Sequence, residues 1–499
     1  MDDETRDSPP ETADSAEESP AGPAIGRDEW VARHGERQAA RSGRLGVVEA
    51  RLRAAPWWAW LTLFTGLVAV MPVGVESGYW RRVSFDTALL VLLALGLNVV
   101  VGWGGLLDLG YVAFYGIGAF AYAFLASDKY DVHLATILVI PAVVVIGVVI
   151  GFLVGLPSRR LLGDYLAIVT LFFLQIFLTV TTNGDDLFGH NVTNGPNGIL
   201  NVDPFGFAGR DLPVSHNGVF NVAYVYVALG AFVLVYVALR LVNQSRTGRA
   251  WRSLREDPLA AEVMGMPVNW LKLMSFAFGA AVAALTGTLF AAVNADVFNL
   301  SFSFPLLITV YTAVILGGSG SQAGVVLGAM LIWPLQERLR EPADSRVLFY
   351  AFVLLGLLAA FRLSLRLAFV VGGLLAFGFA AHGVAQAIDP AWVGGVGQGP
   401  GRVGDWASHW VVVPTHLATW IPPVSYILLI AVVLVLTLLR GWLRLVLLVP
   451  ALYLAAFVWE SVMLAQPEPT RYIVLGALLV ALMVIRPNGL LGEKRVEIV

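Results

Sequence analysis

The chain carries, between two long apolar segments, the charged stretch Ser245-Arg-Thr-Gly-Arg-Ala-Trp-Arg-Ser-Leu-Arg-Glu-Asp-Pro-Leu-Ala-Ala-Glu-Val-Met-Gly265. Its four arginines recur at every third position from Arg246 to Arg255, so we expect a helix to gather them into one basic ridge. A solvated loop that keeps arginines on one side of a membrane would carry similar charges. The charges alone therefore leave both interpretations open.

A second helix start follows at Asp257-Pro258. Aspartate is a preferred N-cap residue, and proline at the first helical position gives up no hydrogen bond. Residues 259–264 provide a small, mostly apolar contact surface, and Gly265 fits a C-terminal stop. A short helix with Ala260 and Ala261 at its centre, held beside a membrane, is typical of a part that fits into a groove of another protein.

Composition assigns the chain to the membrane proteins. Mean hydropathy is +0.75, hydrophobic residues make up 58% and charged residues 13%, which are too few charges to cover a water-soluble protein of 499 residues. The 51 glycines fit close helix packing in lipid, because small residues let backbones approach. We therefore predict an all-α, polytopic helical membrane protein.

Several kinds of chemistry are excluded by the residues that the chain lacks. It has no cysteine, which rules out disulfides, thiolate nucleophiles and thiolate metal sites. The seven histidines follow no metal-ligand spacing, and no Walker motif occurs, so ATP hydrolysis would require a separate chain. We predict no catalytic residue, no metal, no cofactor and no nucleic-acid partner.

From residue 56 onward, apolar spans of about 20 residues follow one another, which is the length that crosses a hydrocarbon core of about 30 Å. The predicted spans are 57–75, 84–102, 105–126, 133–156, 165–182, 219–242, 269–293, 305–317, 320–336, 347–361, 367–387, 422–440, 442–464 and 472–486. The span at 305–317 is short and could be re-entrant, and the glycine-rich span at 105–126 could be broken. Non-helical backbone at such depth is tolerated only where protein or a water-filled path covers it.

Residues 1–55 differ from the rest of the chain. They are acidic and proline-rich at first and offer little apolar surface to bury, so we predict a largely disordered cytoplasmic tail, with a helix at most over 29–52. The order of its charged and apolar regions does not match a signal peptide.

Lysine and arginine in short loops predict the orientation in the membrane. The clusters that fall on the predicted cytoplasmic side are Arg159-Arg160, the 246–255 cluster, Arg362 with Arg366, Arg440 with Arg444, and Lys494-Arg495. The segments that fall on the opposite side are 128–131, the long loop 183–218, Asp296 and 394–420. Arg81-Arg82 and the 338–346 arginines are exceptions to this pattern. Both termini are therefore predicted to be cytoplasmic.

Polar residues at membrane depth are candidates for a translocation path, because an ionisable group there is expensive and predicts function by default. Asn98, Asp108 and Tyr111 lie in or beside the glycine-rich break. Alternatively, Asp108 sits at the cytoplasmic interface beside the 102–105 turn, where backbone donors satisfy it. Gln175 and Asn197 complete the set of path candidates.

Glycines at helical spacing predict close helix packing. Gly320, Gly324 and Gly328 are four residues apart, so we expect them along one helix face, and Gly116 and Gly118 are assigned the same role. The run at 316–328 lacks the lysine of a phosphate-binding P-loop.

Six blocks of the sequence occur in a characteristic order. They are Ala94-Leu-Gly-Leu-Asn98 with 104–120, Tyr165-Leu-Ala-Ile-Val-Thr-Leu171, Gly195-Pro-Asn-Gly-Ile199, 245–266, 316–328 and Ile485-Arg-Pro-Asn-Gly-Leu-Leu-Gly492. Together they resemble the permease subunits of branched-chain amino acid ABC importers, over residues 84–340 and 472–492. The triplet Leu109-Gly110-Tyr111 resembles the LivM type more than its LivH partner, which tends to carry histidine at the last position.

The resemblance implies an ABC importer permease fold in which the charged stretch docks onto an ATPase subunit. The coupling residues it implies, by motif position, are Gly248, Arg249, Ala250, Arg255, Glu256, Asp257, Ala260, Ala261 and Gly265. The two alanines would allow close approach, and the charged residues 255–257 could fix the register through complementary charge.

The resemblance also implies partners. An importer of this kind contains ABC ATPase subunits, a second homologous permease of the LivH type and an extracytoplasmic solute-binding protein, all at the plasma (inner) membrane of a prokaryote and surrounded by lipid. The solute-binding protein would deliver branched-chain amino acids to the face that carries the loop 183–218. Members of the same family carry urea or short amides, so urea and short amides are alternative substrates.

The chain departs from the family pattern after residue 341. We divide it into the tail 1–55, a permease core 56–340 with coupling loop 243–268, an insertion 341–470 with extra transmembrane helices and outer loop 388–421, and a final helix with cytoplasmic tail, 471–499. Either 347–361 or 472–486 could be the family's last helix. The insertion could pack at the periphery, contact the binding protein or be inert.

Two other classes remain as alternatives. An ion-coupled secondary transporter would use membrane carboxylates, for which Asp108, Asp164 and Asp296 are the candidates. A membrane enzyme such as a lipid transferase would need His, Asp or Glu clustered on one leaflet; Glu256, Asp257 and Glu262 come nearest to that, and they fit docking better. Neither class requires a docking helix.

Overall fold

A computed structural model describes residues 77–492, with gaps at 159–163, 188, 208–209, 217–218, 362–363, 394, 396–401, 440, 464–466 and 486–488, together with Thr62, Thr65 and Gly66. The chain divides into two units, 1–68 and 69–499. In the first, the Thr65 hydroxyl donates to the Thr62 carbonyl. The predicted tail 1–55 lies outside the described residues, as does most of the predicted span 57–75.

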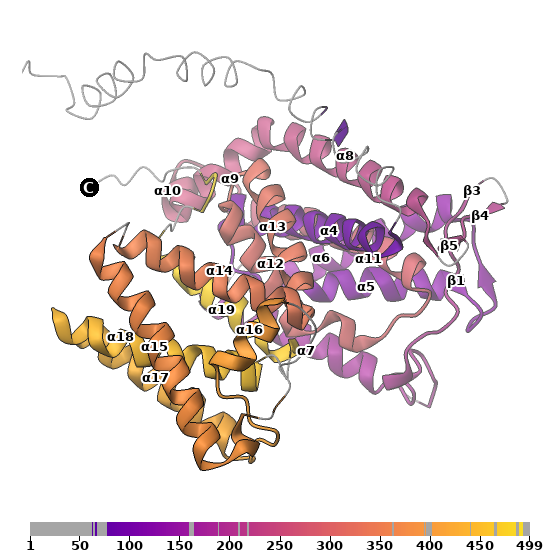
Figure 1. Cartoon of the computed structure of the whole chain (residues 1–499). Helices are drawn as coiled ribbons and strands as arrows, with labels where there is room; N and C mark the ends of the chain where they lie inside the picture. Colours follow the sequence, from indigo (N-terminus) through magenta and orange to yellow (C-terminus); the bar gives the residue numbers. More distant parts are fainter. Residues whose placement is uncertain are drawn as a thin grey trace, which may run out of the picture. The chain divides into compact units, whose positions relative to one another are not determined.

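The second unit is built of helices (Figure 1). The long ones are α4 (Gly78–Leu97), α5 (Tyr111–Leu125), α6 (Thr136–Ser158), α7 (Asp164–Thr182), α8 (Val222–Gln244), α11 (Val268–Asn294), α12 (Phe304–Gly317), α13 (Gln322–Arg340), α14 (Pro342–Phe361), α15 (Leu365–Ile388), α17 (Ile421–Leu438), α18 (Trp442–Val458) and α19 (Pro467–Ile485). Within the described residues, nine helices are long and apolar enough to cross a membrane. The prediction of an all-α, multi-pass membrane protein is confirmed.

The remaining elements are short. They are α9 (Arg246–Glu256), α10 (Pro258–Val263), α16 (Arg402–Trp410), the π-helical turns Asn98–Trp103 and Trp459–Met463, and the 3₁₀ turns Gly195–Asn197, Asn299–Phe302 and Pro390–Trp392. Three antiparallel ribbons of two-residue strands lie in the loops after α5 and α7: β1 (Ala126–Ser127) with β2 (Val132–His133), β3 (Gly206–Phe207) with β4 (Arg210–Asp211), and β5 (Ser215–His216) with β6 (Val219–Phe220). Their registers pair Ala126 with His133, Gly206 with Asp211, and Ser215 with Phe220.

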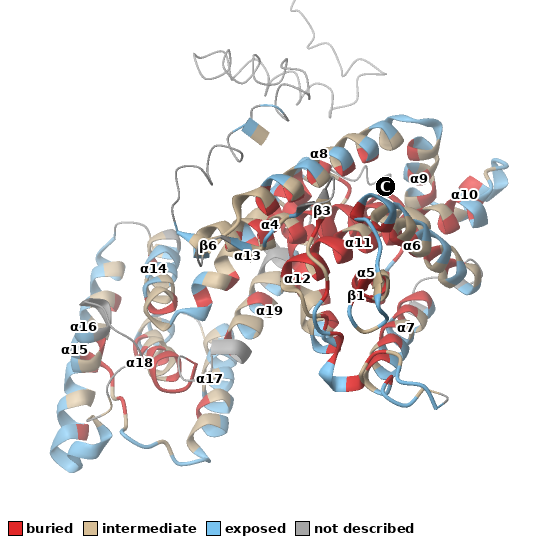
Figure 2. Ribbon diagram, turned by 90° about the vertical axis from the view of Figure 1, so that its right-hand side faces the viewer, coloured by how far each residue is buried: buried red, intermediate tan, exposed pale blue. Residues whose placement is uncertain are grey.

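The core of the second unit is centred on α11, which packs against α4, α5 and α6. Figure 2 shows the buried residues concentrated in α4, α5, α11 and α12, while α15 and α17 are mostly exposed. Gly118 of α5 lies against the backbone of Ala284, where a side chain would clash. Gly147 and Gly151 of α6 lie against Ala284 and Ala280 in the same way. Small residues thus let three helices approach closely, as in other membrane bundles.

The predicted glycine seam needs one correction. Gly324 and Gly328 lie on α13, where a side chain would clash with the carbonyls of Gly317 and Ala313 on α12. Gly320 lies before the helix and has a φ of +95°. It is not on the helix face, because the chain reverses between α12 and α13 and this reversal needs a residue in the left-handed region. Gly116 of α5 lies against the ring of Phe177 rather than against another backbone.

The predicted span 105–126 is broken. Helix α4 runs into a π-helical turn that ends at Trp103, and α5 begins only at Tyr111. Between them Gly105 takes a φ of +65°, and residues 104–110 are not helical. Gly104, Leu106, Asp108 and Gly110 of this break are buried, so protein covers much of its non-helical backbone, whereas Gly105 and Leu107 are exposed.

The segment after α13 forms packed helices of its own, in which α15 and α17 both contact α18 (Figure 1). One of its apolar clusters includes Trp410, Val411 and Tyr453. A buried ion pair also holds this segment together. The Arg346 guanidinium of α14 lies 2.9 Å from the Glu460 carboxylate, and Tyr350 donates a hydrogen bond to the same carboxylate.

The final helix returns to the core. Helix α19 packs against α12 and α13, and the Leu490 and Leu491 amides donate to the Leu316 and Gly317 carbonyls. Of the two segments that could be the last helix of the family pattern, 472–486 is thus the one that lies on α12. Helix α14 packs against α13, α15 and α16 instead.

The buried ion pair gives the first prediction. Changing Glu460→Ala leaves the Arg346 charge uncompensated in the interior, so we expect the free energy of unfolding to fall by about 3–5 kcal/mol. Denaturant unfolding of the purified full chain measures this. Asp405→Ala, which removes an exposed carboxylate from neighbouring α16, should change it by about 0.5 kcal/mol or less. Equal effects of the two changes would contradict the prediction.

Candidate functional site

The charged stretch folds as two short helices, α9 and α10, and the ends of α10 follow the predicted capping chemistry. Ser245 caps α9, and Gly248 lies so close to the Asn243 backbone that a side chain would clash. The Asp257 carboxylate accepts hydrogen bonds from the Leu259 and Ala260 amides, at 2.9 and 3.1 Å, and so caps α10. The predicted helix start at Asp257-Pro258 is confirmed.

The end of α10 also follows the prediction. Gly265 takes a φ of +79° directly after the helix. Its amide donates to the Glu262 carbonyl, and the Met266 amide donates to the Ala261 carbonyl. This is the hydrogen-bond pattern of a glycine C-cap.

One face of α9 is buried against the core. Trp251 is fully buried and stacks on Trp103 at the end of the π-helical turn, with ring centroids 6.2 Å apart. The Trp251 Nε1 donates to the Leu271 carbonyl at 2.8 Å. The Trp103 Nε1 donates to the Gly320 carbonyl at 3.0 Å. Two tryptophans therefore connect α9, the broken helix and the α12–α13 turn.

Arg255 reinforces this connection. Its Nη1 donates to the Gly102 carbonyl at 2.6 Å, and its Nη2 lies 3.5 Å from the Ser319 hydroxyl. The aliphatic part of its side chain packs on Gly105. The guanidinium thus points into the chain's own core.

The expected single ridge of arginines is therefore wrong. Residues on an α-helix are separated by about 100°, so a spacing of three drifts by about 60° at each step. Arg246 and Arg255 consequently lie on opposite faces of α9. The Arg249 Nη1 stays at the exposed surface and donates to the Gln244 carbonyl, and Ala250 lies half-buried beside it. A register role for Arg255 against a partner does not fit its inward position.

Four segments distant in sequence meet at this point. Gly320 sits at the centre, since its amide donates to the Asn98 Oδ1 at 2.8 Å and its carbonyl accepts from Trp103. The C-terminal segment reaches the same turn, because Gly489 packs on Gly318. We call residues 98–105, 251–255, 316–321 and 489–491 the coupling junction.

Asp108 and Tyr111 are buried on the far side of the break. The Asp108 Oδ1 accepts from the Gly110 amide at 2.9 Å, while the Tyr311 hydroxyl donates to the Asp108 carbonyl and accepts from its amide. The Asp108 Oδ2 and the Tyr111 hydroxyl are buried without a hydrogen-bond partner among the described residues. The alternative interpretation, in which backbone donors satisfy Asp108, therefore holds for one of its two carboxylate oxygens.

The other path candidates lie elsewhere. Gln175 is exposed on α7, and Asn197 is exposed in a 3₁₀ turn of the loop after α7. The structure thus brings Asn98, Asp108 and Tyr111 to the broken helix and leaves these two apart from it. Whether any of the five lines a path stays a prediction. The side chain of Asp164 lies outside the described residues.

A second polar cluster was missed by the sequence analysis. The Arg82 Nε lies 3.1 Å from the Asp86 carboxylate, and its Nη2 donates to the Asn294 Oδ1 at 2.7 Å. Asp86 also lines a cavity of about 100 Å³ with Tyr115 and Ser301. The available signal was a pair of opposite charges four residues apart inside an apolar span. The sequence analysis treated Arg82 merely as an exception in the loop charges.

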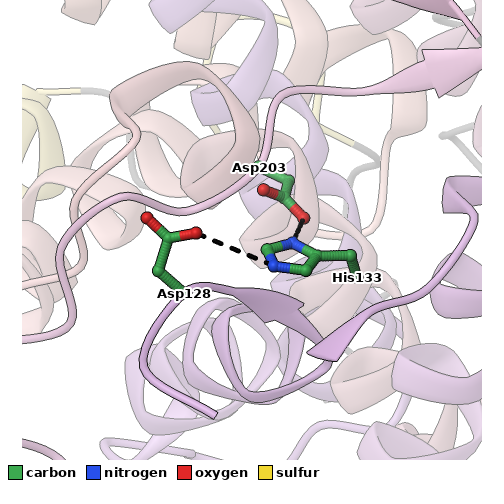
Figure 3. A group of neighbouring side chains, drawn as sticks. All are labelled: Asp128, His133 and Asp203. Carbon is green, nitrogen blue, oxygen red and sulfur yellow. Dashed lines mark hydrogen bonds and ion pairs between the residues drawn. The ribbon is translucent and has the colours of Figure 1, made fainter. Parts of the chain in front are cut away.

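The loops at the other end of the bundle form a compact cap. Asp203, His133 and Asp128 lie side by side there (Figure 3), with His133 Nδ1 2.7 Å from the Asp203 carboxylate and His133 Nε2 3.7 Å from that of Asp128. These three residues could supply metal ligands. Because Asp203 occupies one imidazole nitrogen, the arrangement fits a hydrogen-bonded network better than a metal site. The hydrogen bond to Asp203 raises the pKa of His133.

The same cap joins loops that the charge pattern placed on one face. The Val202 amide donates to the Ala295 carbonyl, Ile199 pairs with Val297, and the Asp203 amide donates to the Ala126 carbonyl. The segments after α5, α7 and α11 therefore share one end of the bundle, opposite to the coupling junction.

Comparison with known proteins gives the family. A family model described as branched-chain amino acid transport system / permease component matches residues 81–361. The chain belongs to this family. The high-affinity branched-chain amino acid transport system permease protein LivM of Salmonella typhimurium (strain LT2) is 37% identical over 297 residues, which cover 55% of this chain and 68% of that protein. LivM of Escherichia coli (strain K12) is 36% identical over the same shares.

The permease protein LivH of Escherichia coli (strain K12) is a more distant relative, 24% identical over 257 residues that cover 48% of this chain and 78% of that protein. No solved structure matches the chain significantly. The resemblance to the LivM type is thus confirmed. The match to the permease family ends with α14, so α15 to α19 lie beyond it.

The Asp203–His133 contact predicts a pH dependence. A raised pKa in the folded protein means that the protonated imidazole stabilises the cap fully below the ordinary value of about 6.5. This contribution is lost as the pH rises from there through the raised pKa.

Asp203→Asn should therefore lower the pKa of His133 toward its ordinary value, as followed by NMR titration of the imidazole ring in nanodiscs. Asp128→Asn should lower it less, because Asp128 acts only through charge at a longer distance. A His133 pKa that stays unchanged in Asp203→Asn would contradict this assignment.

Proposed function

We propose that the chain is the permease subunit of an ATP-binding-cassette importer for branched-chain amino acids, which couples ATP hydrolysis by partner subunits to solute uptake. The observation that carries the proposal is the bond from Arg255 to the Gly102 carbonyl, 2.6 Å long, between the docking stretch and the broken helix. Family membership supports the transported class, since the LivM and LivH relatives are named for branched-chain amino acid transport.

Helix α10 is the part that fits an ATPase subunit. Leu259, Val263 and Met264 are 70%, 87% and 78% exposed, which is unusual for apolar side chains on a short polar loop. Ala260 is exposed beside them, whereas Ala261 is buried against the chain itself. The docking contact is therefore made by the three large side chains, with Ala260 allowing close approach and Ala261 holding α10 in place.

A displacement of α10 would reach the membrane core through α9. Trp251 and Arg255 connect α9 to the end of the π-helical turn, and that turn is continuous with α4. The break at 104–110 carries Asp108 and leads into α5. A chain of packed side chains and hydrogen bonds of this kind can transmit a change between two arrangements.

This function fixes the sidedness of the chain. The end with α9 and α10 must be cytoplasmic, where ATP is available. The cap formed by the loops after α5, α7 and α11 then faces outward and receives an extracytoplasmic solute-binding protein. A second, homologous permease completes the pathway beside this chain.

The Arg82–Asp86 pair supports an amino-acid substrate. Its two charges could bind the carboxylate and ammonium groups of a zwitterion, each through charge-assisted hydrogen bonds. Urea and short amides carry no such charges. A cavity of about 100 Å³ lies beside Asp86.

Two substitutions on α10 test the docking surface. Leu259→Glu with Val263→Glu places charges where the partner's groove is apolar, so we expect co-purification of the ATPase subunits from native membranes to fall by about tenfold or more. Leu365→Glu changes another exposed leucine, 90% exposed at the start of α15, and should keep the ATPase subunits bound.

The proposal fails if the parent chain purifies without any ATPase subunit and still moves leucine under an ion gradient after reconstitution. That outcome would establish an ion-coupled secondary transporter.

A substitution at Arg255 distinguishes coupling to transport from docking of the ATPase subunits. Arg255→Gln removes a charge-assisted hydrogen bond worth about 1.5–3 kcal/mol, so leucine uptake should fall by about tenfold or more while the ATPase subunits still co-purify. Arg246→Gln, on the opposite exposed face of α9, should keep most uptake. Joint loss of uptake and co-purification in Arg255→Gln would show that this residue serves docking instead.

A further inference from the structure

A large cavity lies between α14, which the permease family match includes, and α15 and α18, which lie beyond that match. It has a volume of about 730 Å³ and is lined by residues of α14, α15 and α18. The residues that matter for its chemistry are Leu357, Arg366, Trp442, Arg444, Leu445 and Leu448.

The cavity opens at the same end of the bundle as the coupling junction. Helix α13 leaves that end at residue 322, and α14 returns to it at Phe361. Helix α15 then starts there. The far end of α18 is tied by Glu460 to Arg346 at the start of α14, so Trp442 at its near end lies close to Phe361.

Two arginines give the cavity its charge. Arg366 and Arg444 are both exposed, and neither makes an ion pair or a hydrogen bond with another described residue. The described lining residues include no aspartate or glutamate. Guanidinium groups are planar and weakly hydrated, and they bind phosphate through pairs of parallel hydrogen bonds. The mouth of the cavity thus complements an anionic phosphate group.

The deeper wall has the opposite character. Leu357, Leu445 and Leu448 line it, and Trp442, which is 69% exposed, stands at the mouth. Tryptophan is enriched at the level of lipid headgroups, and leucine side chains match acyl chains. Charge at the mouth and an apolar interior occur together in lipid sites between transmembrane helices.

We propose that this cavity binds one anionic phospholipid, with its phosphate held by Arg366 and Arg444 and an acyl chain along Leu357, Leu445 and Leu448. The bound lipid fills the space between α14, α15 and α18. This site is independent of the transported solute, because it requires only that the chain lies in a membrane.

Native mass spectrometry of the purified full chain, titrated with phosphatidylglycerol, measures the binding of one lipid. We expect phosphatidylglycerol to bind about thirtyfold more tightly than phosphatidylethanolamine, as two arginines near a membrane surface would provide. Arg366→Gln with Arg444→Gln should abolish this preference. Leu445→Trp should weaken binding although both arginines remain, because it fills the space for the acyl chain.

A charge-matched control separates a specific site from general surface charge. Arg246→Gln with Arg252→Gln removes two exposed arginines at the same end of the bundle and should leave phosphatidylglycerol binding unchanged. Equal losses in both double variants would overturn the proposal. Displacement of the lipid by equimolar inorganic phosphate would also overturn it, since that would indicate a site for free phosphate. If the Arg366/Arg444 variant does not fold, a lack of preference in the parent chain, or full binding in Leu445→Trp, still refutes the site.

Discussion

The hydrogen bond from Arg255 to the Gly102 carbonyl resolves a problem created by the broken helix. Where α4 ends in a π-helical turn, its last carbonyls have no partner within the helix. An unsatisfied carbonyl at membrane depth costs several kcal/mol, so the break needs donors from outside. Arg255 supplies such a donor to the Gly102 carbonyl, and the Gly320 amide holds the same turn by donating to the Asn98 side-chain Oδ1. The break is therefore stable in this form only while α9 and the α12–α13 turn remain in place.

In the proposed function, this dependence gives the break a role in coupling as well as in structure. Backbone that is held by distant side chains can exchange one set of partners for another, whereas a continuous helix cannot. Asp108 lies within the break, with one carboxylate oxygen accepting a hydrogen bond from the Gly110 amide and the other without a described partner. A buried polar group left partly unsatisfied is costly, so it favours any rearrangement that brings it a partner.

Local chemistry made much of the fold predictable, and tertiary contacts decided the rest. The apolar spans and the Asp257 cap depend on nearby residues, so the sequence predicted them. The direction of Arg255 depends on helix phase: a spacing of three drifts around the helix, and burial of Trp251 then turns Arg255 inward. The position of Gly320 depends on where α12 and α13 meet, and the Arg82–Asp86 cluster requires Asn294 from α11. No local pattern contains those contacts.

The helices between α13 and α19 obey a topological constraint. Helix α19 must run toward the coupling junction, because Leu490 and Leu491 bond to the end of α12 there. The chain leaves α13 at the opposite end, so the helices between α13 and α19 must bring it back to that end. Among the described residues, α14, α15, α17 and α18 are the long helices between them, and four crossings satisfy this condition. An odd number of crossings would place the C-terminal segment at the other end of the bundle, and the coupling junction would then lack residues 489–491. The contacts of Leu490 and Leu491 with the end of α12 therefore require an even number of crossings between α13 and α19.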